Sequence, residues 1–304
     1  MAKKIIGVVL GLAAVGFLGF WLVYLPLLVV HAQRHPAETT PASMGVRYED
    51  VAFPSKDSSL TIRGWWMPAE NPRAVLVFVH GASGNRREIH SRGLELAKFL
   101  VSRHATVLTI DLRNHGTSDG TPNGRLSLGY GESNDVIGAV AYASSRAPQL
   151  PVYLMGSSMG GAAVVYAAAF RAPVKGLVLL DPVLDPHTTS INFVQAVLGA
   201  PRWFVVPIVW SAETFFSGDP GHHDPLATAE TLKLPILLIQ DDRDPVCRPS
   251  TAATLARANP NITLWISHDP PKQGDNVGWG YHTAAYVVNP TEVQAQLTQF
   301  LHVN

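Results

Sequence analysis

Residues 151–160 have the sequence PVYLMGSSMG, and they join an apolar strand pattern to a helix pattern of small residues at 161–169. The last five, Gly156–Gly160, form a G-x-S-x-G pattern centred on Ser158. Between a strand and a helix this pattern predicts a nucleophile elbow, a turn so tight that the residues two before and two after the serine must lack bulk. The turn would lift the Ser158 hydroxyl clear of the sheet edge and aim the helix N-terminus at it. The alternative is a Gly- and Ser-rich turn without chemistry.

The composition narrows the class of protein. The chain has 304 residues, of which 47% are hydrophobic and 15% charged, so it carries apolar sequence beyond an ordinary core. The 23 basic and 23 acidic residues give a formal net charge of zero, and no basic field argues for nucleic acid. The single cysteine, Cys247, excludes an intramolecular disulfide and disfavours a cysteine-based zinc site.

An apolar run without charge occupies residues 5–30. As a helix it would reach about 39 Å, enough to cross ~30 Å of hydrocarbon with some tilt. This length favours an uncleaved single-pass anchor over a signal peptide cleaved near Val30-His31-Ala32, and over a buried core helix. Lys3 and Lys4 precede the run and Arg34 follows it. This small bias predicts a cytoplasmic N-terminus and a catalytic domain on the outer, periplasmic or extracellular side.

The rest of the chain alternates strand and helix patterns, which predicts an α/β fold with a mostly parallel, doubly wound sheet and helices on both faces. We expect a transmembrane anchor at 1–30, a linker at 31–45 and one domain at 46–304. Strands are predicted at 47–53, 60–67, 74–79, 105–110, 151–155, 176–180, 236–240 and 262–266. Helices are predicted at 88–102, 133–145, 161–169, 250–258 and 291–301.

One stretch, at about 182–224, breaks this alternation. A structureless loop of that length is improbable in a compact domain, and this one is rich in bulky apolar residues. It is predicted to be a small helical cap over the active site, offering an apolar wall to an acyl chain and a face that dips into the membrane. The alternative is an ordinary pair of core helices.

Five motifs, in this order along the chain, resemble the α/β-hydrolase superfamily. The resemblance covers residues 46–301 and is greatest to membrane-anchored serine esterases and lipase-like proteins. It implies the α/β-hydrolase fold, with a small helical cap and one N-terminal transmembrane helix. The motifs are the loop His80–Gly84, the run Asp111–Ser118 with Asn114 in place of a glycine, the elbow Gly156–Gly160, the loop Gln240–Val246, and Gly280-Tyr281-His282.

A serine hydroxyl is a poor nucleophile on its own, so Ser158 needs a base within hydrogen-bond reach. The resemblance places that base at His282, before the closing helix, and the order Ser, Asp, His along the chain agrees with it. His268, nearer to the last strand, is the rival base.

The base must be oriented by a carboxylate. The resemblance assigns this role to Asp244, just past the strand at 236–240. Asp241 and Asp242 are close enough in sequence to be mistaken for it. Asp181, at the end of another strand, is a separate rival.

The resemblance also implies that two backbone amides, those of Ala82 and Met159, form the oxyanion hole. No cofactor and no metal are expected. The run His222-His223-Asp224 and the thiol of Cys247 both lack partner ligands at metal-binding spacing. A structural role as a turn beside the elbow is expected for Asp111, Arg113, His115 and Ser118, and a helix start for Glu132 and Asp135.

These features predict a serine hydrolase that cleaves a carboxylic ester or thioester with an apolar acyl part through an acyl-enzyme. The expected partners are a small-molecule ester or lipid-like substrate and the membrane, through the N-terminal helix, with no nucleic acid. Because one triad serves many reactions, the alternatives are a peptidase or amidase, or other chemistry of the same fold. A membrane-tethered binding protein without activity is a further alternative.

Overall fold

The computed structural model describes residues 1–57, 60–218, 221, 223–268 and 281–303. Its centre is an eight-stranded sheet in the order β1-β2-β4-β3-β5-β6-β7-β8. The first two pairings, β1 with β2 and β2 with β4, are antiparallel, and all the others are parallel. The predicted α/β class with a mostly parallel sheet is confirmed. The strands are β1 Glu49–Pro54, β2 Thr61–Met67, β3 Ala74–Val79, β4 Ala105–Asp111, β5 Val152–Ser157, β6 Leu177–Leu180, β7 Ile236–Asp241 and β8 Ile262–Ser267.

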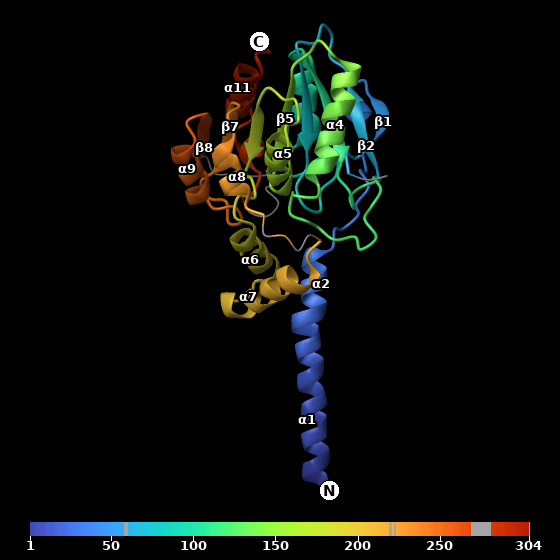
Figure 1. Cartoon of the computed structure of the whole chain (residues 1–304), viewed down its shortest axis with the longest axis vertical. Coiled ribbons are helices and arrows are strands. Elements are labelled where there is room, and N and C mark those ends of the chain that lie inside the picture. The colour runs from blue at the N-terminus through green and yellow to red at the C-terminus, as the bar shows by residue number, and fades with distance from the viewer. Residues whose placement is uncertain (58–59, 219–220, 222, 269–280, 304) are drawn as a thin grey trace.

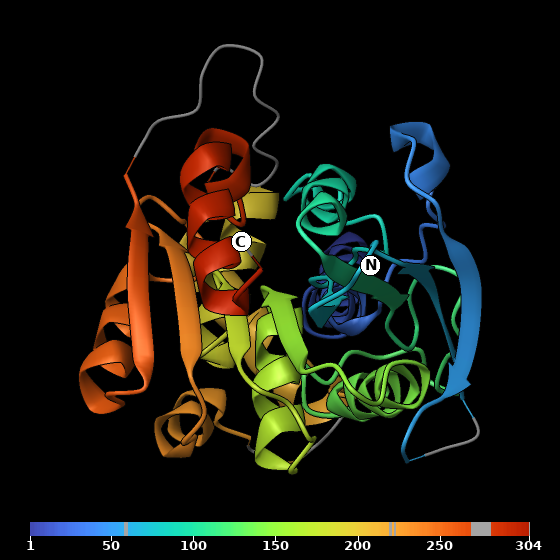
Figure 2. The ribbon, with the colours of Figure 1, turned by 90° about the horizontal axis from the view of Figure 1, so that it is seen from above.

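Helices cover both faces of this sheet (Figure 2). A separate hydrophobic core lies between the sheet and the helices on each face. One face carries α4, α5, α8 and α9, and the other carries α3, α10 and α11. The inner strands are buried on both sides, which explains why β3 and β5 are continuous apolar runs rather than alternating ones. The helices are α3 Gly93–Ser102, α4 Ser133–Arg146, α5 Met159–Ala169, α8 Pro225–Thr231, α9 Pro249–Ala258, α10 Ala285–Val288 and α11 Pro290–Leu301.

The N-terminal helix extends away from the sheet (Figure 1). It comprises α1 Ala2–Gly19, the π-helical η1 Phe20–Tyr24 and α2 Leu25–Val30. It is long and apolar enough to cross a membrane, and none of its most apolar 18-residue window is buried in the protein. The alternative of a buried core helix therefore does not hold for α1.

Three helices fill the insertion between β6 and α8, and we call them the inserted helices: α6 Pro186–Leu198, α7 Arg202–Ser211 and the π-helical η3 Ala212–Phe216. They lie beside the C-terminal end of the N-terminal helix (Figure 1). α6 starts where Asp185 accepts a hydrogen bond from the Thr188 amide, and it ends at Gly199 in the left-handed conformation. The insertion is thus helical, as its apolar composition indicated.

Residues 31–45 lie against the sheet domain. His31 forms a β-bridge with Arg125, and the Arg34 guanidinium donates to the Ser118 carbonyl at 2.7 Å. A short 3-10 helix, Pro41–Met44, precedes β1. The limits predicted for anchor, linker and domain remain predictions.

The predicted helix at 88–102 is shorter in the structure. Its first residues cannot be helical because Glu88 and Arg92 have positive φ, 45° and 48°. α3 therefore begins at Gly93, where a Cβ would lie 2.7 Å from the Arg87 carbonyl oxygen. The turn directs Glu88 inward, where it is only 5% exposed.

Candidate active site

The turn between β5 and α5 has the geometry expected of an elbow. Ser158 is held at φ 52° and ψ −119°, a sparsely populated conformation for a residue with a side chain. A Cβ at Gly156 would lie 2.2 Å from the Gly160 carbonyl oxygen, and one at Gly160 would lie 2.4 Å from that of Val79. Both glycines are therefore required by close backbone approach, and Ser158 precedes the first residue of α5.

His282 contacts the Ser158 hydroxyl, and Asp244, from a separate loop, contacts His282. His282 Nε2 lies 2.9 Å from Ser158 Oγ, and His282 Nδ1 lies 2.8 Å from Asp244 Oδ2. An ionised carboxylate only accepts, so Nδ1 carries the proton and Nε2 offers a lone pair to the serine hydroxyl. The other carboxylate oxygen accepts from the amides of Val246 at 2.7 Å and Cys247 at 3.0 Å, which fixes Asp244 on its own loop.

The rival base lies elsewhere. His268 is 69% exposed in its side chain, and its Nδ1 lies 2.8 Å from Asp242 Oδ2. The structure therefore brings Ser158, Asp244 and His282 together and pairs His268 with Asp242 on the surface. Gly280, the first residue of the predicted Gly280-Tyr281-His282 motif, lies outside the described residues.

Asp181, the rival acid, is buried and faces backbone rather than the imidazole. Its Oδ1 accepts from the Asp241 amide at 2.8 Å, and its Oδ2 accepts from the Thr283 amide at 2.7 Å. Burial and the nearby charge of Asp244 raise the pKa of this carboxyl well above its usual range. Asp181 thus ties the loop that carries Asp244 to the loop that carries His282.

The loop after β3 passes close beside the serine. A Cβ at Gly81 would lie 3.0 Å from Ser158 Cβ, and the next residue is Ala82. Within the described chain, no hydrogen bond is formed by the amides of Ala82 or Met159. Both residues line the same cavity as Ser158. These two amides can therefore donate to a ligand oxygen.

Sequence reasoning missed Glu88, whose side chain holds this loop through hydrogen bonds. One of its oxygens accepts from the Gly81 amide at 3.2 Å and from the Ser157 hydroxyl at 2.9 Å. The carboxylate therefore connects the loop after β3 to the residue before the nucleophile. The helix pattern at 88–102 concealed this role.

Two buried imidazoles also shape the loop. His80 accepts from the Leu112 amide at Nε2 and donates from Nδ1 to the Gly81 carbonyl, 2.7 Å away. His115 accepts from the Ser83 amide and lies against the His80 ring. Burial, with the neighbouring His115, lowers the pKa of His80 to about 3, and burial likewise lowers the pKa of His115. Both rings are thus neutral at pH 7 and act as hydrogen-bonding struts.

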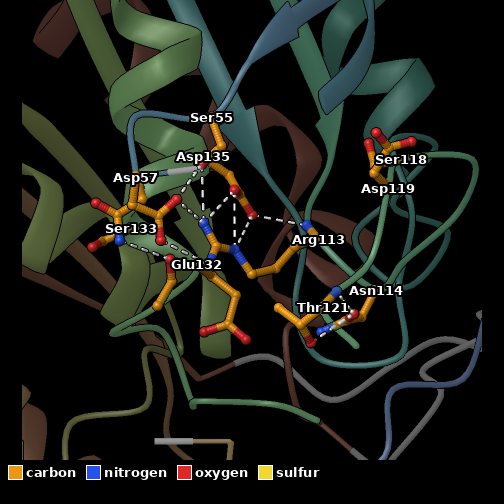
Figure 3. A network of polar contacts seen from close by, with 12 residues as sticks. Ser55, Asp57, Arg113, Asn114, Ser118, Asp119, Thr121, Glu132, Ser133 and Asp135 are labelled. Carbon is orange, nitrogen blue, oxygen red and sulfur yellow. Dashed lines mark hydrogen bonds and ion pairs between the residues drawn. The ribbon is translucent and has the colours of Figure 1, made fainter. Parts of the chain in front are cut away.

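The run after β4 forms a network of polar contacts (Figure 3). Arg113 bonds Asp135 on α4 and Asp57 after β1, each at 2.8 Å from Nη2. Asp111 accepts from the amide and guanidinium of Arg86, and Ser118 Oγ donates to the Asp111 carbonyl. These contacts fix the run to the loop between β1 and β2, to α4 and to the loop after β3.

A cavity of about 390 Å³ opens at Ser158. Its lining combines the site residues with two apolar groups, one from the inserted helices and one from the end of the N-terminal helix. A larger, more polar cavity of about 530 Å³ lies between α6, α8 and α9, but neither Ser158 nor His282 lines it. The smaller cavity is therefore the candidate substrate pocket.

A metal site requires several donor atoms close together. Among the described residues, Asp244, Cys247 and His282 lie close enough to form a possible ligand group. Burial and the charge of Asp244 raise the pKa of the Cys247 thiol, which favours the protonated form over a thiolate ligand. His222 lies outside the described residues, and Asp224 caps α8 by accepting from the Ala227 amide.

Part of this sequence is similar to a known protein family. Residues 70–217 match the model of a family described as serine aminopeptidase, S33. This region includes Ala82 and Ser158 and ends before Asp244 and His282.

Curated relatives include lipases. The human monoglyceride lipase is 31% identical over 178 residues, which cover 57% of this chain and 56% of that protein. A lysophosphatidylserine lipase of Macaca fascicularis is 26% identical over 203 residues, 60% of this chain and 47% of that protein. The uncharacterized protein YfhR of Escherichia coli K12 is 28% identical over 205 residues, 65% of this chain and 63% of that protein. The chain thus spans about half of the length of its mammalian relatives.

Solved structures extend the likeness over the sheet domain. An esterase of Pyrococcus furiosus superposes with a TM-score of 0.73 over 90% of this chain and 97% of that chain, at 23% identity. Est1E of Butyrivibrio proteoclasticus superposes with a TM-score of 0.61 over 84% of this chain and 100% of that chain, at 17% identity. At these identities the likeness shows the fold.

Proposed function

The chain belongs to the α/β-hydrolase superfamily, and from that premise we propose that it is a serine hydrolase acting on carboxylic esters or thioesters with an apolar acyl part. One observation carries the proposal. The Ser158 hydroxyl, on a strained turn, is hydrogen-bonded to His282 at 2.9 Å, and His282 to Asp244 at 2.8 Å, beside a largely apolar cavity.

In the proposed mechanism Ser158 Oγ attacks the substrate carbonyl while His282 Nε2 takes the hydroxyl proton. Asp244 holds the imidazole in its working tautomer and stabilises the imidazolium. The amides of Ala82 and Met159 donate to the oxyanion of the tetrahedral intermediate. His282 then returns the proton to the leaving alcohol or thiol, which leaves an acyl-Ser158 ester.

The second half of the reaction repeats these roles with water. His282 takes a proton from a water molecule, whose oxygen attacks the acyl carbon. The intermediate collapses, the proton passes to Ser158 Oγ, and the carboxylic acid leaves. The lipase relatives support the ester bond as the target. Monoglyceride and lysophosphatidylserine, named by two of them, each carry one acyl chain, which agrees with an apolar acyl part.

Active-site labelling tests the proposal. Detergent-solubilised protein is treated with a fluorophosphonate and mapped by peptide mass spectrometry, alongside Ser158→Ala, His282→Ala and His268→Ala. We expect labelling at Ser158 that is lost in the first two variants and kept in the third, because His268 pairs with Asp242 on the surface. Folded wild-type protein that takes no label would contradict the proposal and favour a binding protein without activity.

We further propose that the N-terminal helix is an uncleaved anchor, with its N-terminus in the cytoplasm. Its length and its apolar, exposed surface support a membrane span. Lys3 and Lys4 before it, against Arg34 after it, support the orientation. Intact mass and protease accessibility in sealed vesicles test both points, and a mature N-terminus at or near Gln33 would contradict the anchor.

A further inference from the structure

The last turns of the N-terminal helix form a wall of the candidate substrate pocket. Leu25, Leu28, Val29 and Val30 all line the cavity that contains Ser158 and His282. Apolar residues of the inserted helices line the same cavity, among them Phe193, Val194, Val197, Ile208 and Val209. A segment predicted to be only an anchor thus contributes directly to the site.

Two hydrogen bonds fix this wall in place. Pro26 has no N–H to offer the Leu22 carbonyl four residues earlier, and the Ser211 hydroxyl at the end of α7 donates to that carbonyl at 2.6 Å. The Trp21 indole N–H donates to the Phe204 carbonyl at 2.9 Å. In a membrane environment, where water is scarce, such partners for backbone carbonyls hold neighbouring helices together.

Apolar contacts extend the same interface. The rings of Trp21 and Phe204 stack with centroids 5.5 Å apart. Val29 packs against a cluster shared by α6 and α7, which contains Ile191, Val194, Val205 and Val209. Directly after α2, the bridge between His31 and Arg125 attaches the chain to the sheet domain. The wall is therefore held from both sides.

The position of the wall along the helix places the pocket at the membrane surface. A hydrocarbon layer of ~30 Å takes about 20 helical residues, so a span that starts at Ile5 ends near Tyr24. The pocket-lining turns follow directly. The inserted helices beside them expose Trp203, Trp210 and Phe215, which are 72%, 54% and 62% exposed. Trp is favoured at the interface between membrane and water, so these side chains match that depth.

We propose that the N-terminal helix is a substrate-binding element, and that the pocket between it and the inserted helices takes the acyl chain of a single-chain lipid ester directly from the bilayer. The inference rests on the proposed function, because the cavity is at the proposed nucleophile. The cavity of about 390 Å³ is at the small end of ligand pockets, which fits one chain. The helix that holds the protein on the membrane also forms the acyl-binding wall.

The first experiment adds bulk to the wall and leaves Ser158, Asp244 and His282 unchanged. Leu28→Phe adds bulk to a pocket-lining residue that is 52% exposed, and Leu18→Phe makes the same change at a 47% exposed residue that does not line the pocket. Full-length proteins are assayed in detergent with p-nitrophenyl acetate and p-nitrophenyl dodecanoate. We expect Leu28→Phe to change the ratio of dodecanoate to acetate kcat/KM by about fivefold or more, and Leu18→Phe to leave it unchanged.

The outcomes separate the two proposals. Acetate hydrolysis with the same ratio in both variants and wild type would overturn the inference and leave the proposed function standing. Wild-type protein that neither hydrolyses acetate nor labels at Ser158 would overturn the proposed function. The circular dichroism spectrum and the melting temperature of Leu28→Phe, compared with wild type, report whether the variant is folded.

A second experiment does not depend on turnover. A long-chain alkyl fluorophosphonate with a diazirine at its chain end is attached to Ser158 and irradiated. We expect cross-links to peptides containing residues 25–33, and cross-links confined to other parts of the chain would overturn the inference.

A third experiment distinguishes the source of the substrate. Protein in phosphatidylcholine vesicles is given the dodecanoate ester at fixed total concentration while the amount of lipid is varied. A rate that follows the mole fraction of ester in the bilayer supports entry from the membrane. A rate that stays unchanged as lipid is added, at the same total ester concentration, would overturn it.

Discussion

Two pairs of His and Asp lie at the carboxyl end of the sheet, and only one of them meets a serine. In both, an imidazole Nδ1 lies 2.8 Å from a carboxylate oxygen. In the first pair, the side chains of His282 and Asp244 are 8% and 0% exposed, and Ser158 completes the arrangement. In the second, those of His268 and Asp242 are 69% and 32% exposed.

This difference is why only the buried pair is a candidate catalytic pair. Solvent screens the surface pair and offers other hydrogen bonds to both groups, so the contact contributes little. In the buried pair, Asp244 is held by two amides, and its oxygen has the imidazole as its partner. An oriented, desolvated carboxylate is what a catalytic base needs.

The largest expected effect comes from replacing each histidine. His282→Ala removes the proposed base and should lower kcat for p-nitrophenyl acetate by about 10⁴–10⁶-fold. The matched change His268→Ala should leave kcat within about twofold, because its exposed ring pairs with the surface carboxylate of Asp242 and not with Ser158 among the described residues. Steady-state kinetics of the two variants measure the contrast, and similar losses in both would break the comparison.

Replacing each carboxylate comes next. In Asp244→Asn the side-chain amide can donate to Nδ1, which favours the tautomer with its proton on Nε2 and removes the acceptor for Ser158. We expect a loss of about 10³–10⁴-fold in kcat. Asp242→Asn, in contrast, should be close to wild type. A modest loss in the first variant would mean that the buried carboxylate does not orient the imidazole.

Asp181 is expected to affect the buried pair, because it accepts hydrogen bonds from the two segments that carry Asp244 and His282. An asparagine there has one accepting oxygen and one donating NH₂ group, so either the Asp241 or the Thr283 amide loses its acceptor. We expect Asp181→Asn to cost about 1–3 kcal/mol of the free energy of unfolding and to lower kcat about tenfold through misplacement of His282. Urea unfolding and kinetics measure both quantities.

The control for that variant is Asp185→Asn, at the N-cap of α6, where asparagine accepts equally well. It should change neither quantity. If Asp181→Asn lowered stability but not kcat, Asp181 would be only a structural residue.

The smallest effect concerns Asp241, between the two pairs. Burial raises the pKa of this carboxyl to about 6, above the value of about 3.9 in an unfolded chain. The folded protein therefore holds a proton more tightly, and its stability falls as pH rises from about 4 to about 6. Asp241→Asn removes this dependence, so the variant should gain about 1 kcal/mol relative to wild type over that range, a figure reduced for solvent screening. Urea unfolding at pH 4 and pH 7 tests it, and a gain independent of pH would contradict it.

The elbow and the strands could be predicted because their signals are local. Gly156 and Gly160 are required by contacts within a few residues or with the neighbouring strand, and the apolar run of β3 reflects burial on both faces. The choice between His282 and His268 is different. It depends on which loop the fold brings to Ser158, 124 residues away along the chain.

Two features could not be predicted from the sequence, and each has a physical reason. Glu88 lies within a helix-like pattern, yet the positive φ of Glu88 and Arg92 turns it inward toward Gly81 and Ser157. The contact between Trp21 and Phe204 spans 183 residues, so no window along the chain could indicate it. Pro26 was the available signal, because a proline within an apolar helix leaves a carbonyl that needs a partner.

The attachment of α2 to the pocket has a practical consequence for protein production. Deleting the residues before His31 is an obvious way to obtain a protein that purifies without detergent. Such a preparation would keep Ser158, Asp244 and His282 and still act on small, soluble reporter esters. It would lose Leu25, Leu28, Val29 and Val30 from the cavity, and with Val29 the apolar cover over the cluster of the inserted helices. A substrate screen run on it would then rank esters by a pocket that the full-length protein does not have.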